Sequence, residues 1–195
     1  MPTGPGGLDS NGIWQFGEDD SEALASDLLN LGMGSVSDAF TNLAGVLQVV
    51  STTKTDTFST TSTSLTDVTG LAATITPVAT SSRIRVTVSV PHGHSNTTGN
   101  IVLVLRDGSD NPILNPTSPG NRSESFFAGL FGYTSVMGVS SFTFVHSPST
   151  TSAFTYKVSC LTAGGTFFVN RSGDDSNVKQ FGRGVATVTL TEVAG

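Results

Sequence analysis

The feature that most constrains this chain is an alternation of apolar and polar side chains after residue 80. Ile84, Val86, Val88 and Val90 alternate with Arg83, Arg85, Thr87 and Ser89. Successive side chains of a β-strand point to opposite faces, so this pattern predicts a strand with one buried and one solvated face. Residues 101–105 are apolar on both faces, which predicts a central strand. The period of two returns at residues 142–144, 154–160, 167–169 and 188–190.

Turn-forming residues separate these segments. They are Asp107-Gly108, Ser118-Pro119-Gly120, Ser147-Pro148, Ala163-Gly164-Gly165 and Ser172-Gly173-Asp174-Asp175. The stretch 51–69 is rich in Thr, which favours extended structure. About eight or nine short strands joined by such turns predict a mainly β fold, an antiparallel β-sandwich with a jelly roll as the leading variant.

The first fifty residues differ from the rest in charge and in hydrophobic period. All nine Lys and Arg residues follow position 50, whereas seven of the fifteen Asp and Glu residues precede it. Asp19 and Glu22 have the spacing of a helix-capping pair. Helical spacings of three and four then join Leu24, Leu28 and Leu31, and again Val36, Phe40, Leu43, Leu47 and Val50. We therefore expect residues 1–50 to be an acidic anchoring segment with one or two helices, and residues 51–195 to be a β-sandwich body.

Aromatic anchors framed by charge are typical of interfaces, so this segment is a candidate attachment site. Its candidate contact residues are Trp14, Phe16, Asp19, Asp20, Glu22, Leu24, Leu28, Leu31, Phe40 and Leu43. The helix would lie on a symmetry axis, dock in the groove of a partner, or pack on its own β body. The sequence leaves these three alternatives open.

The overall composition narrows the class of protein. Hydrophobic residues make up 36% of the chain and charged residues 12%, which suits a packed core. The single cysteine, Cys160, has no internal partner for a disulfide. No apolar run approaches the roughly 20 residues that span a bilayer, and the first residues do not resemble a signal peptide. The acidic balance argues against nucleic acid as a partner.

The sequence contains few residues in patterns that indicate chemistry. His92 and His94 would share a face of an extended segment, so three chains around an axis would offer six imidazoles to a metal. The simpler interpretation places both in a solvated loop. Loops 107–111 and 174–177 hold oxygen ligands suited to calcium but also read as ordinary turns. No pair of carboxylates lies in an apolar setting that would raise a pKa for glycoside hydrolysis. We expect no enzymatic activity and no cofactor beyond that axial metal.

The segment Phe126–Tyr133 concentrates four of the fifteen aromatic residues. Such a run is typical of a core strand and also of a homo-oligomer contact. Phe126, Phe127, Phe131 and Tyr133 are therefore candidate trimer contacts.

Several phrases of the sequence resemble small virion proteins of tailed bacteriophages. In the β part these are Thr55-Asp56-Thr57-Phe58, Asp67-Val68-Thr69-Gly70-Leu71, Ile75-Thr76-Pro77, Ser81-Ser82-Arg83-Ile84, Phe144-Val145-His146-Ser147-Pro148, Thr155-Tyr156-Lys157-Val158, Val169-Asn170-Arg171-Ser172 and Thr189-Leu190-Thr191-Glu192-Val193-Ala194. Near the start, Gly12-Ile13-Trp14, Gly17-Glu18-Asp19-Asp20 and Ser26-Asp27-Leu28-Leu29-Asn30-Leu31 resemble the anchoring segments of phage appendages.

This resemblance implies a homotrimeric, non-enzymatic appendage that attaches to the particle through its N-terminus. It implies assembly in the host cytoplasm and other phage structural proteins, of tail or capsid, as partners. A tail fibre or minor tail protein that contacts a host surface glycan is the main expectation. A capsid decoration protein or head fibre is the first alternative, because the chain has no repeated shaft. A carbohydrate-binding module is the second.

Overall fold

The computed structural model describes residues 7–8, 14–15 and 45–195, except 115, 117–119, 121 and 131. The chain divides into two compact units, Met1–Gly45 and Val46–Gly195. In the first unit, strand β1 (Gly7–Leu8) pairs antiparallel with β2 (Trp14–Gln15), with Leu8 opposite Trp14. Up to position 44, the residues of the predicted helices lie outside the part of the chain that the structure describes.

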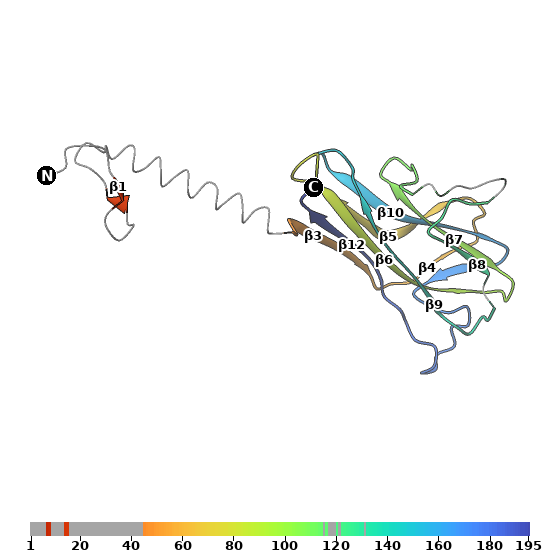
Figure 1. The fold of residues 1–195 in the computed structure, drawn as a ribbon. Helices are drawn as coiled ribbons and strands as arrows, with labels where there is room; N and C mark the ends of the chain where they lie inside the picture. Colours follow the sequence, from red (N-terminus) through yellow and green to blue (C-terminus); the bar gives the residue numbers. More distant parts are fainter. Residues whose placement is uncertain are drawn as a thin grey trace. The chain divides into compact units, whose positions relative to one another are not determined.

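The second unit, which we call the body, is built from strands (Figure 1). They are β3 (Gln48–Lys54), β4 (Phe58–Thr60), β5 (Thr66–Ile75), β6 (Arg83–His94), β7 (Asn100–Asp107), β8 (Phe127–Leu130), β9 (Gly138–His146), β10 (Phe154–Ala163), β11 (Phe167–Val169) and β12 (Ala186–Val193). Among its described residues the body contains no helix, and no described helix is long and apolar enough to cross a membrane. The strands expected from the period of two are all present.

The strands form two antiparallel sheets. One has the order β5-β10-β7-β8, and the other has the order β3-β12-β6-β11-β4 with β9 also paired to β6. Residues 84–89 of β6 pair with both β12 and β9, so these two strands lie on opposite edges of β6. The mainly β, antiparallel prediction is confirmed. The strand order does not by itself establish the jelly-roll variant.

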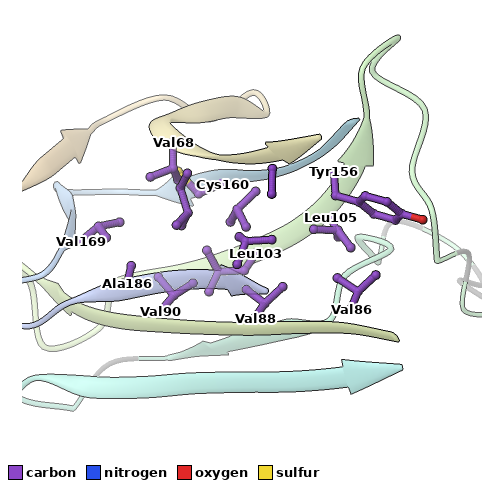
Figure 2. Packing of buried hydrophobic residues seen from close by; sticks show 14 of the residues in the cluster. Val68, Val86, Val88, Val90, Leu103, Leu105, Tyr156, Cys160, Val169 and Ala186 are labelled. Carbon is purple, nitrogen blue, oxygen red and sulfur yellow. The ribbon is translucent and has the colours of Figure 1, made fainter. Parts of the chain in front are cut away.

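The core lies between the two sheets, where alternate residues of facing strands meet. Figure 2 shows Val86, Val88 and Val90 on one side of this layer and Leu103 and Leu105 on the other. All five are essentially inaccessible to solvent. Burial of each such side chain stabilises the fold by roughly 1.5–3 kcal/mol relative to exposure. The alternation that predicts the strands therefore also provides the main stabilisation of the body.

The helical pattern that reaches Val50 is wrong in its last residues. Gln48 begins strand β3, and Val50 lies opposite Leu190 of β12. The N–H of Leu47 donates to the carbonyl of Glu192 at 2.8 Å, which extends the ladder by one residue. Adjacent β-branched residues and the available edge of β12 favour the strand over the helix. The body accordingly starts at Val46 rather than at residue 51.

Candidate binding site on the outer face of the four-stranded sheet

The outward-facing side chains of β7 are the starting point of the candidate site. Val102 and Val104 point away from the core, yet they are only 5% and 3% exposed. Ile113 and Phe126 lie along one edge of β7, where Ile113 N–H donates to Leu105 O and Phe126 N–H donates to Leu103 O, both at 3.0 Å. Pro112, Gly120 and Arg122 also lie beside Val104. The outer face of β7 is therefore shielded from solvent.

A cluster of oppositely charged side chains lies beside the shielded outer face of β7. The Arg106 guanidinium donates to Asp67 Oδ1 at 2.5 Å, and Lys157 Nζ donates to Asp67 Oδ2 at 3.0 Å. Both cations also pair with Asp110, Arg106 at 3.3 Å. Ser159 Oγ accepts from Arg106 Nε at 2.7 Å and donates to Asp67 at 2.6 Å. The cluster joins β5, β7 and β10 with the turn after β7.

The protonation state of Asp67 limits what this cluster can do. Burial raises the pKa of the Asp67 carboxyl, but hydrogen bonds from Ser159, Lys157 and Arg106 outweigh burial and lower the pKa to about 2. An acid catalyst at neutral pH needs a carboxyl with a raised pKa. Asp67 is thus an ionised structural partner and not a general acid.

Next to the cluster, beside Val104 on the outer face of β7, lies a cavity of about 400 Å³. Leu65, Val104, Pro112 and Leu161 supply its apolar lining, and Arg106, Asp110, Gly120, Arg122, Ser123 and Glu124 supply its polar lining. An apolar floor with a few convergent polar groups is typical of a small-molecule site. Both signs of charge are present, so the lining offers both donors and acceptors of hydrogen bonds.

Acid should weaken the body through Asp67. Because the pKa of Asp67 in the folded chain (about 2) is below the ordinary pKa of 3.8, ionised Asp67 stabilises the fold above about pH 4, and this contribution is lost as the pH falls toward 2. The side chain is 45% exposed, so solvent screening limits the effect to about 1 kcal/mol. In urea unfolding at pH 6 and pH 2.5, D67N should lose less stability on acidification than the wild type. D174N, which changes a half-buried carboxylate outside this cluster, should follow the wild type, and equal losses of stability on acidification for all three proteins would contradict this assignment.

The structure places His92 and His94 in the body's interior, so the expectation of a solvated loop is wrong. His92 Nε2 lies 2.7 Å from Ser140 Oγ on β9, and its ring contacts Phe127 and Phe167. Burial lowers the pKa of His92 to about 4. These contacts assign His92 to the packing of β6 against β8, β9 and β11.

His94 has a different set of partners. Its Nδ1 accepts from the backbone N–H of Asn96 at 3.0 Å, so the neutral ring carries its proton on Nε2, which donates to Thr162 Oγ1 at 2.8 Å. Thr162 in turn donates to the carbonyl of Asn100 at 2.8 Å. The two imidazoles therefore bond to different strands rather than to a shared point. Among the described residues, no three His, Cys, Asp or Glu side chains are grouped to hold a metal ion.

The aromatic segment divides between the core and the surface. Phe126 and Phe127 are partly buried against the core, and the Phe126 ring stacks on Phe142. Leu130 and Tyr133 are 77% and 70% exposed. Phe131 lies outside the described residues. Phe126 and Phe127 thus fit the core interpretation, and the interface interpretation stays a prediction for Tyr133.

The attachment candidates cannot be placed in a site. The backbone of Trp14 lies in β2, and the other nine candidates, from Phe16 to Leu43, are outside the described residues. The charged cluster, in contrast, was missed by the sequence analysis. The sequence did contain a signal for this cluster, because two otherwise apolar strands each carry a cation at an outward position. These cations are Arg106, which follows Val102 and Val104, and Lys157, within residues 154–160.

Comparisons with known proteins give only distant structural neighbours. No family model and no curated protein matches the sequence. A structure of infectious bursal virus derived T=1 particles aligns with a TM-score of 0.41 at 17% identity, over 75% of this chain and 36% of that chain. The Gx strain of infectious bursal disease virus aligns with a TM-score of 0.40 at 12% identity, over 77% and 37%. The VP2 subviral particle of that virus aligns with a TM-score of 0.37 at 17% identity, over 75% and 38%. The chain thus spans little more than a third of each of these proteins.

Proposed function

We propose that this chain is a non-enzymatic structural component of a virion, a homotrimeric appendage that attaches to the particle through its N-terminal segment. One observation carries the proposal: the change in charge coincides with the division into structural units. The unit Met1–Gly45 has seven acidic residues and no Lys or Arg, and all nine basic residues belong to the body. A separate acidic unit suits docking on a basic partner surface. The resemblance to tailed-phage appendages supports a tail fibre or minor tail protein with a jelly-roll-like body.

The first residues of the body are fastened to β12. Glu192 is fully buried on β12 and accepts hydrogen bonds from Gln48 Nε2 and, at 2.7 Å, from the backbone N–H of Val78. Its carbonyl also accepts from Leu47. Burial raises the pKa of Glu192, but hydrogen bonds from Ser82, Gln48 and Val78 outweigh it and lower the pKa. An ionised carboxylate thus holds the first residues of β3 in place.

Among the described trimer-contact candidates, Tyr133 is exposed, and its near neighbour Leu130 is exposed as well. Phe126 and Phe127 pack inward and are used within the chain. A three-fold contact through exposed Tyr133 would match the preference of interfaces for aromatic side chains.

Deletion of residues 1–45 tests the attachment. The truncated chain starts before β3, so it should fold with the far-UV and thermal signature of the body, yet it should be absent from purified particles. The full chain, expressed in the same host, is the control for incorporation. Normal incorporation of the truncated chain would exclude an N-terminal anchor. The copy number of the full chain separates the two locations, because a few trimers per particle indicate the tail and many indicate the capsid.

Carbohydrate binding is a second candidate function, and the cavity beside Val104 favours it. Its polar lining surrounds an apolar floor, which suits the two kinds of surface on a sugar ring. The function would fit an appendage that meets a host surface glycan. A glycan array probed with the full chain and with Arg122→Ala tests the cavity directly.

A further inference from the structure

Strand β9 is an edge strand without the features that normally protect such an edge. It has nine residues, contains no Pro, Lys, Arg, Asp or Glu, and pairs on one side with β6 (Figure 1). Among the described strands, none pairs with its other edge. A long edge with unpaired N–H and C=O groups is a template for a further strand unless charge, proline, a bulge or shortness blocks it.

The other edge strands of the described sheets do have such protection. β3 ends in Lys54, β4 has three residues, and β8 has four. β5 carries Asp67 and a register shift opposite Lys157 and Ser159. β9 therefore stands apart as the edge that is left open to pairing.

The sequence of β9 also indicates which strand would fit it. Its outward-facing positions are symmetric about Phe142, with Ser141 and Thr143 on either side and Val139 and Val145 three residues away. A two-fold antiparallel pairing centred on Phe142 would place Val139 opposite Val145 of the second copy, and Ser141 opposite Thr143 of the second copy. A two-fold contact must be self-complementary in this way.

The faces of the strand agree with this register. Val139 and Val145 point outward and are 61% and 50% exposed. Their partners on β6 are Pro91 and Arg85. On the inner face, Phe142 would meet its own copy, and the large Phe144 would lie opposite the small Ser140. Exposed valines thus meet valines, hydroxyls meet hydroxyls, and a large side chain meets a small one.

We propose that two copies of this chain pair antiparallel through β9, centred on Phe142, to form one sheet that continues across both molecules. The contact is a two-fold one, so it is additional to the three-fold contact of the proposed appendage and independent of the attachment segment. It would link neighbouring copies, or neighbouring trimers, side by side.

Thiol cross-linking of the full chain tests the register. With a short bismaleimide, V139C/V145C should give covalent dimers, because the two introduced thiols meet across the pair. V139C alone and V145C alone should not, since each would lie about 20 Å from its own copy (six residues at about 3.3 Å). Native Cys160 is fully buried and should stay unmodified in all three proteins. Absence of dimers from the double variant, or equal yields from the single variants, would overturn the proposal.

Charge variants give a readout that does not depend on cysteine chemistry. Light scattering of the full chain over a range of concentrations should show that V139K/V145K raises the dissociation constant of the β9 pair by roughly tenfold or more, because lysines then face lysines. V139K/V145E should pair nearly as well as the wild type, since each lysine then faces a glutamate. V49K/V78K, at exposed valines away from β9, is the control for added charge. Equal masses for the Lys/Lys and Lys/Glu variants would exclude this register.

Discussion

Replacement of Gly99 by alanine is expected to destabilise the body by about 3 kcal/mol, at the upper end for overpacked cores. A Cβ at this position would lie 1.8 Å from Cε1 and 2.0 Å from Nδ1 of His94. The ring has no room to retreat, because His94 is fully buried and bonded to Thr162 and Asn96. A loss of this size in a chain of this length lowers Tm by roughly 10 °C.

A double-mutant cycle distinguishes this collision from a general effect of alanine. H94A alone should be destabilising, because it leaves a void and removes the hydrogen bond to Thr162. In G99A/H94A the added methyl enters the space that the ring has left, so the double variant should be more stable than the sum of the two losses predicts. G182A is the control, since nothing lies within 4 Å of a Cβ there. Urea unfolding of the wild type and of these four variants measures the losses of stability. Additive losses in G99A/H94A would contradict the proposed contact.

The alternation of apolar residues was enough to predict the strands, because it reflects burial within each strand. Ile84–Val90 and residues 154–160 lie in β6 and β10 as expected. The strand at Gln48–Lys54 was harder to predict, because Leu47 and Val50 also fit a helical spacing. The ladder with β12, a segment more than 130 residues away, decides the outcome.

The sites depend on which strands become neighbours in the fold, and the sequence of a single segment does not determine that pairing. Asp67 meets Lys157 only because β5 pairs with β10. Similarly, Nδ1 of His146 on β9 lies 2.8 Å from the hydroxyl oxygen of Tyr156 on β10. A spacing of two residues places His92 and His94 on one face, but it does not distinguish a metal site from two packed imidazoles.

Asn170 is a second position where one side chain fixes several segments. It is fully buried, follows β11 and has a φ of 64°, a left-handed conformation that asparagine tolerates better than most residues. Its Nδ2 donates to the carbonyls of Lys54 and Asp56 at 2.8 and 2.9 Å. Its own backbone bonds to Pro91 and Gly184. The turn after β3 is thereby fastened to the end of β6.

Three substitutions at Asn170 separate the contributions of its side chain and its backbone. N170G keeps the left-handed backbone and loses two hydrogen bonds, so we expect a loss of about 2 kcal/mol. N170A adds the cost of a left-handed alanine, about 1 kcal/mol more. N170D should be the worst, at about 4 kcal/mol, because a buried carboxylate oxygen would then face two carbonyl oxygens with no donor between them. Its loss should also shrink at low pH, where a protonated carboxyl donates one bond. Urea unfolding at pH 7 and pH 4 measures the order, and N170D as stable as N170G would show that Nδ2 does not hold this turn.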